Sequence, residues 1–133
     1  MYKKTIKYVD YNGLNREEDF YFNLNKAEIA EMNMRASGNL VETYQKIVNA
    51  KDYNALVDIF KDLIRKSYGV KSEDGKHFIK NEQVFLDFAQ TEAYSELFVE
   101  LASDAEAAAE FFNGIIPSAN TTKAAAIPAT TTN

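Results

Sequence analysis

The chain has 133 residues, a formal net charge of −5 and no cysteine, and its isoelectric point is about 4.9. The length suits one domain, the acidic balance argues against a nucleic-acid binder, and the lack of cysteine excludes disulfides and favours a reducing cytoplasm. The N-terminus lacks the apolar segment of a signal peptide, and no apolar run approaches the ~20 residues that span a bilayer, so we expect no membrane association.

The first segment predicts a β-hairpin. Residues 3–11 are rich in β-branched and aromatic side chains, Asn12-Gly13 is a strong turn signal, and DFYFNL at residues 19–24 reads as the returning strand.

The register of this hairpin stays open at the level of the sequence. A tight turn at Asn12-Gly13 places Phe20 opposite Thr5, whereas a longer loop or a bulge pairs Ile6 with Phe20. The tight turn leaves Ile6 facing Asp19, whereas the longer loop also pairs Tyr8 with Phe22.

Three helices are expected between residues 25 and 69. The first two start with residues whose side chains accept hydrogen bonds from free backbone N–H groups: Asn25, with Glu28 completing a capping box, and then Asn39. The third opens at Asp52 or Tyr53. Gly38 and Gly69 are expected to end the first and third helices. The apolar stripes are Leu40, Val41, Tyr44, Ile47 and Val48 in the second helix, and Tyr53, Leu56, Val57, Phe60, Leu63 and Ile64 in the third.

Residues 70–80 read as a polar loop with a turn at Asp74-Gly75, and this loop holds the only histidine, His77. A catalytic triad would have to be built around that one residue. No metal-binding motif and no glycine-rich phosphate loop is present. We therefore expect no catalytic, cofactor or metal site.

Three more helices are expected after residue 80, starting near Asn81, at Thr91 and at Ser103. Ser103 with Glu106 reads as a capping box, and Gly114 is expected to follow the last helix as its C′ residue.

The expected fold class is α+β, with an N-terminal β-hairpin followed by a mainly α-helical bundle of five to six helices. The residues from 118 onward are mostly Ala and Thr, and such a segment cannot bury enough apolar area to offset its loss of conformational entropy. We therefore expect one folded domain over residues 1–117 and a flexible tail over residues 118–133.

The last three helices carry more large apolar side chains than one buried face each would need. Either these short helices pack on several neighbours, or they expose a patch that binds an apolar helix or a second copy of the chain. The residues are Phe85, Leu86, Phe88, Phe111, Phe112, Ile115 and Ile116. Glu92, Glu96 and Glu100 share one helix face, which is either solvated or a docking strip for a basic partner helix.

Four segments carry a family resemblance: KTIKYVDYNG, EDFYFNLNKAEI, SYGVKSEDGKHFIK and FAQTEAYSELFVELASDAEAAAEFFNGIIP. Together they resemble the tail assembly chaperones of long-tailed bacteriophages, and are most similar to those of phages and prophages of Gram-positive bacteria. The resemblance covers about residues 1–117 and rests on whole segments, without a short diagnostic motif.

The resemblance implies a non-enzymatic protein of the host cytoplasm that is absent from the mature virion. Such chaperones coat the tape measure protein and release it as tail tube subunits polymerise around it. A programmed frameshift in many of these phages makes a longer product that recruits the major tail tube protein. Self-association is also expected, and binding to nucleic acid or membrane is not.

Two other classes compete with this interpretation. A small structural tail or neck protein would be present in purified particles, whereas a chaperone would not. A small enzyme would act through His77 or through paired carboxylates such as Glu73 and Asp74, and replacing His77 with alanine would then abolish its function.

Overall fold

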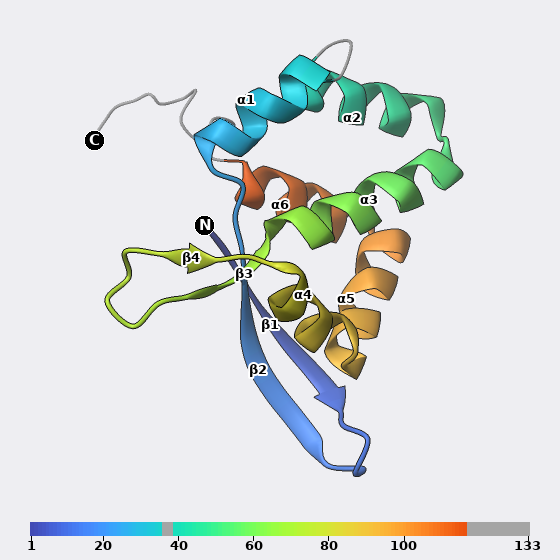
Figure 1. Ribbon diagram of the computed structural model, residues 1–133. Helices are drawn as coiled ribbons and strands as arrows, with labels where there is room; N and C mark the ends of the chain where they lie inside the picture. Colours follow the sequence, from blue (N-terminus) through green and yellow to red (C-terminus); the bar gives the residue numbers. More distant parts are fainter. Residues whose placement is uncertain (36–38, 117–133) are drawn as a thin grey trace, which may run out of the picture.

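The computed structural model describes residues 1–35 and 39–116 (Figure 1). The expected tail, residues 118–133, and the expected end of the first helix at Gly38 lie outside the described residues. The described chain is α+β, with the predicted N-terminal hairpin and six helices. The strands are β1 (Tyr2–Val9), β2 (Asn15–Phe22), β3 (Tyr68–Lys71) and β4 (Phe78–Ile79). The helices are α1 (Lys26–Arg35), α2 (Leu40–Ala50), α3 (Tyr53–Ser67), α4 (Glu82–Ala89), α5 (Glu92–Ser103) and α6 (Ala105–Ile115).

The hairpin register differs from both predicted alternatives. Strands β1 and β2 are antiparallel, and Phe20 lies opposite Lys4. The turn is wider than a two-residue turn, because the backbone N–H of Asp10 donates to the carbonyl oxygen of Leu14 at 2.9 Å. Gly13 adopts a φ of 83° within it, and the Asp10 carboxylate accepts from the backbone N–H groups of Asn12 and Leu14. One extra residue in the turn therefore sets the pairing of the whole hairpin.

The segment predicted as a polar loop contains a second, short hairpin. Strands β3 and β4 pair antiparallel, and β3 joins the edge of β2 to give the sheet order β1-β2-β3-β4. The predicted turn is present, with Gly75 at a φ of 77°. Within residues 70–80 only Val70, Phe78 and Ile79 are large and apolar. The alternation of apolar and polar residues that marks a strand is therefore too short to be recognised in the sequence.

Gly69 does not end α3 as predicted but lies buried in β3. A Cβ atom at this position would lie 2.7 Å from the Phe78 ring and 2.9 Å from the Ile79 carbonyl oxygen. The missing side chain thus lets β4 pack closely against β3.

Most predicted helix caps are present. Asn25 and Glu28 form a reciprocal capping box, with bonds of 2.8 and 2.9 Å between each side chain and the other residue's backbone N–H. Side-chain caps are also made by Asn39, Asp52 and Asn81.

The caps of α5 and α6 differ from the prediction. Thr91 occupies the N-cap position of α5, but its hydroxyl donates to the Phe88 carbonyl oxygen instead of capping the helix. Asp104 caps α6 by accepting from the backbone N–H groups of Glu106 and Ala107. Ser103 ends α5, so the predicted capping box began one residue too early.

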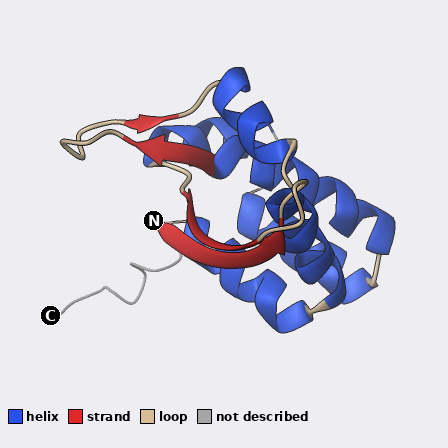
Figure 2. Cartoon of the chain, turned by 90° about the horizontal axis from the view of Figure 1, so that it is seen from below, coloured by secondary structure: helices blue, strands red, loops and turns tan. Residues whose placement is uncertain are grey.

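The core joins the first hairpin to the helices. Phe22 of β2 meets Phe111 of α6 and Phe88 of α4, with ring centroids 5.3 and 5.9 Å apart. Tyr2 of β1 makes an edge contact with Phe111 at 5.6 Å. Figure 2 shows the curved hairpin running along the helical part of the molecule. The fold thus holds the hairpin and the helices in a defined relation to each other.

Candidate functional site: apolar surfaces for protein contacts

The structure places most of the predicted partner-binding residues in the core. Phe85, Phe88, Phe111, Phe112, Ile115 and Ile116 are each at most 6% exposed. Phe112, for example, stacks on Tyr44 of α2 with ring centroids 4.0 Å apart. Packing on several neighbours accounts for these six side chains, which offer no docking surface in this conformation. Of the apolar set, Leu86 alone stays half-buried.

Two of the three glutamates on α5 contact the chain's own hairpin. Glu100 accepts from the Lys4 ammonium group at 3.0 Å, and Glu92 accepts from the Tyr11 hydroxyl at 2.9 Å. The bond to Glu92 raises the pKa of Tyr11, because the phenol donates to a carboxylate. Glu96 between them is exposed and makes no ion pair with a described residue. Glu100 thus attaches α5 to β1 and Glu92 attaches it to the hairpin turn, whereas Glu96 stays exposed.

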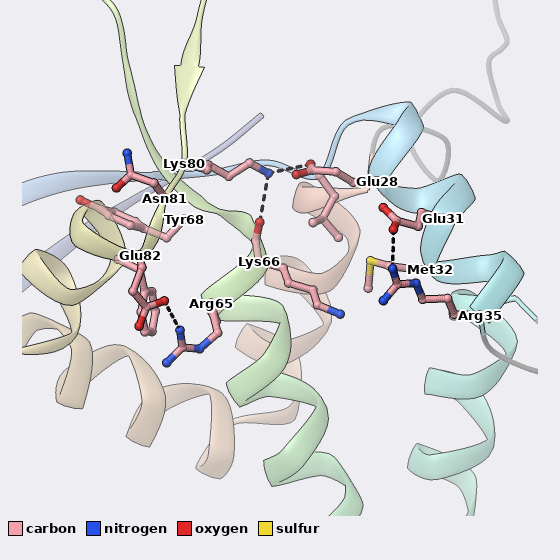
Figure 3. Close-up of a pocket in the computed structure, with 12 residues that line it drawn as sticks. Glu28, Glu31, Met32, Arg35, Arg65, Lys66, Tyr68, Lys80, Asn81 and Glu82 are labelled. Atoms are coloured by element: carbon pink, nitrogen blue, oxygen red, sulfur yellow. Dashed lines mark hydrogen bonds and ion pairs between the residues drawn. The ribbon is translucent and has the colours of Figure 1, made fainter.

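A charged recess of about 330 Å³ lies between α1, the end of α3 and the start of α4 (Figure 3). Its ion pairs are Lys80–Glu28 at 2.6 Å, Arg65–Glu82 at 2.6 Å, Arg35–Glu31 at 2.7 Å and Lys66–Asp62 at 3.1 Å. Each charged side chain that lines the recess thus has an opposite charge beside it. The Arg65–Glu82 pair joins α3 to α4 and the Lys80–Glu28 pair ties α1 to the segment before α4, whereas the other two pairs lie within one helix each.

A larger groove, about 500 Å³, lies between the α2–α3 corner and the α5–α6 corner. We call it the apolar groove. Its lining includes Val48, Tyr53, Val57, Phe98, Ala105 and Ala109. Lys51, at the end of α2, is its one charged lining residue. Such a recess suits an apolar side chain or helix of another protein better than a charged molecule.

The groove is open because the apolar stripes of α2 and α3 extend beyond what the core covers. Val48 is 38%, Val57 37% and Tyr53 68% exposed. Opposite them, α6 begins with alanines that are too short to fill the space, such as Ala105 and Ala109. The long apolar stripes of α2 and α3 and the Ala-rich start of α6 are visible in the sequence. Only the fold shows that these helices face one another across a groove.

The turn of the first hairpin carries a second apolar surface, which we call the hairpin tip: Val9, Tyr11 and Leu14. These side chains are 51%, 75% and 58% exposed. Val9 and Tyr11 were expected within the first strand of the hairpin, and Leu14 was given no role from the sequence.

The described residues give no support to catalysis. His77 is exposed in the β3–β4 turn, and within residues 1–35 and 39–116 no three acidic or histidine side chains gather as a metal site would require. No helix in the described part of the chain is both long enough and apolar enough to cross a bilayer.

A family model described as phage tail assembly chaperone matches residues 1–131, essentially the whole chain. The chain belongs to the phage tail assembly chaperone family. No curated protein and no solved structure matches it. Membership of this family gives the exposed apolar surfaces a context, because an assembly chaperone acts through contacts with other tail proteins.

Proposed function

We propose that this chain is a non-enzymatic chaperone of the tape measure protein. It binds apolar helical segments of that protein and keeps them soluble in the host cytoplasm until tail tube subunits enclose them. Several copies act on one tape measure protein, and a longer frameshifted product recruits the major tail tube protein. The observation that carries the proposal is the family match over residues 1–131.

The chemistry of the chain supports this role. A protein that holds an aggregation-prone helix in solution needs apolar surface for contact and net charge for solubility. The chain has a formal charge of −5, and its described residues include the apolar groove, the hairpin tip and other exposed apolar side chains such as Val41 and Val99.

Co-expression with the tape measure protein of the same phage tests the proposal. We expect the soluble fraction of the tape measure protein to rise when the chain is present, because its apolar stripes are covered. An unchanged soluble fraction would contradict the chaperone role.

The same assay tests the accessible member of the predicted apolar patch. Leu86 is half-buried on α4 and packs against the core, so circular dichroism first checks that Leu86→Glu is folded. In the folded variant the new charge lies where we propose that the client binds. We expect less soluble tape measure protein with this variant than with Met34→Glu, a control at a residue 81% exposed on α1. Equal effects would reject the contact at Leu86 and leave the chaperone role standing.

A structural protein of the tail or neck is the alternative function. Mass spectrometry of purified particles separates the two. We expect the chain in infected-cell lysate and not in particles, since a chaperone leaves when the tube closes. A stoichiometric amount in particles would favour the structural role.

A further inference from the structure

Helix α1 lies on the core with none of its own residues buried. Each of the other five helices in the described chain buries at least two residues. The apolar contacts of α1 with the core come from Ile29 and Met32, which are partly buried. These two residues lie three positions apart and therefore on one face of the helix. Helix α1 can thus leave the core without removing a fully buried side chain.

The surface under α1 carries buried apolar side chains. Ile29 of α1 and Ile116 line a recess of about 190 Å³. Met32 of α1 lines the charged recess together with Leu24 and Phe85. Leu24, Phe85 and Ile116 are each at most 6% exposed while α1 is in place. Without α1 both recesses lose a wall, and these three side chains face solvent.

The Lys80 ammonium group fastens the first turn of α1 to this surface. It donates to the Glu28 carboxylate at 2.6 Å (Figure 3), and the Lys80 side chain is 18% exposed. It also donates to the backbone carbonyl oxygens of Asn23 and Lys66, which lie outside α1. Lys80 therefore keeps two partners when α1 leaves, but it loses the carboxylate that neutralises its charge.

We propose that α1 covers a docking site for a helix of the tape measure protein, and that the client helix takes the place of α1. The helix already seated there defines the chemistry of the occupant. It is an amphipathic helix with two apolar residues one turn apart and an acidic residue beside them. The apolar residues replace Ile29 and Met32, and the carboxylate replaces Glu28 at Lys80. Assignment of this site to the client rests on the proposed function.

This displacement gives a role to two residues that were predicted to contact a partner but are buried. Phe85 and Ile116 each line a recess that has α1 as a wall. Helix α1 keeps them out of water until a client helix arrives, which limits the exposed apolar surface of the free chain. It acts as a competitor within the same chain, because the client binds only the fraction of molecules in which α1 has opened.

Hydrogen exchange of the complex with the tape measure protein of the same phage tests the displacement. Binding slows amide exchange in a segment that it covers, and we expect this in α4 and α6. In α1 we expect the opposite, because a displaced helix of 10 residues is too short to be stable alone in water. Its amides should exchange faster in the complex than in the free chain.

Glu28→Gln tests the contact at Lys80. Glutamine keeps the capping box with Asn25 but removes the charge that faces the ammonium group. The concentration of chain that keeps half of the tape measure protein soluble after dilution from urea should fall about three- to tenfold, because α1 opens more often. Glu31→Gln is the matched control: it makes the same change at an exposed pair with Arg35 inside α1, and it should act like the unmodified chain. Circular dichroism checks that both variants are folded.

Three results would overturn the displacement and leave the chaperone role standing. The first is a complex in which the α1 amides exchange as slowly as in the free chain, or more slowly. The second is a Glu28→Gln variant that solubilises no better than Glu31→Gln. The third is a loss of α1 protection when the chain alone is concentrated, which would assign the site to α1 of a second copy. A chain that forms no complex with the tape measure protein would overturn the proposed function together with this site.

Discussion

Gly114 lies where the last helix packs against the first strand, a role that its position in the sequence does not reveal. It was predicted to end the last helix, but α6 continues to Ile115. A Cβ atom at Gly114 would lie 2.5 Å from Cδ1 of Tyr2. The glycine thus makes room for the Tyr2 ring, which packs edge-on against Phe111. A residue that looks like a helix terminator is instead the contact point between the first strand and the last helix.

Gly114→Ala should destabilise the protein by about 1–3 kcal/mol through overpacking, even though alanine favours a helix by about 1 kcal/mol over glycine. Urea unfolding measures the change. In a Tyr2→Ala background the clash is gone, so the same substitution should be neutral or stabilising. A stabilising effect in the unmodified chain would mean that the Tyr2 ring moves aside at little cost.

Among the helices, α1 buries the least. It has no buried residue, and Lys80 anchors its first turn. The Lys80 ammonium group donates to Glu28 at 2.6 Å and to the carbonyl oxygens of Asn23 and Lys66 at 2.9 and 3.0 Å (Figure 3). Elements that bury little apolar surface unfold locally more readily than the core does.

Hydrogen exchange should therefore show weaker protection in α1 than in α6. Lys80→Met should increase exchange of the α1 amides about tenfold, since charge-assisted hydrogen bonds contribute about 1.5–3 kcal/mol each. Lys66→Met is the matched control, because it removes only an exposed ion pair with Asp62, and such pairs contribute little. Equal protection of the α1 and α6 amides against exchange would contradict the expectation that α1 unfolds locally more readily than α6.

At the scale of the whole molecule, aromatic contacts link the sheet to the helices. Phe22 of β2 meets Phe111 of α6, and Tyr68 of β3 stacks on Phe88 of α4 with centroids 4.4 Å apart. Separating the hairpin from the helices would expose these rings to water.

We therefore expect residues 1–117 to unfold as one cooperative unit. The chain has eight tyrosines and no tryptophan, so tyrosine fluorescence reports the surroundings of strands and helices together, and far-UV circular dichroism reports mainly the helices. The two urea transitions should coincide. An earlier transition by fluorescence alone would indicate that the hairpin detaches first.

Short-range hydrogen bonding made several helix starts and one turn predictable from the sequence. The caps at Asn25 and Asn39 mark helix starts from the sequence alone, because a cap bonds to backbone groups two or three residues away. The Asp74-Gly75 turn is recognisable for the same reason. The family resemblance was also available from sequence, and the family match confirms it.

Burial and pairing depended on the tertiary structure, because they arise between residues far apart in the chain. The extra residue in the first turn shifted the hairpin register, and β3 and β4 formed only because β2 offers an edge for β3. Phe112 was a candidate surface residue, but Tyr44 stacks on it in the core. Val57 was expected in the buried stripe of its helix, but it lines the groove beside the alanines of α6 and is 37% exposed. Apolar periodicity shows which side of a helix is apolar, and only the neighbouring helices decide how much of that side is covered.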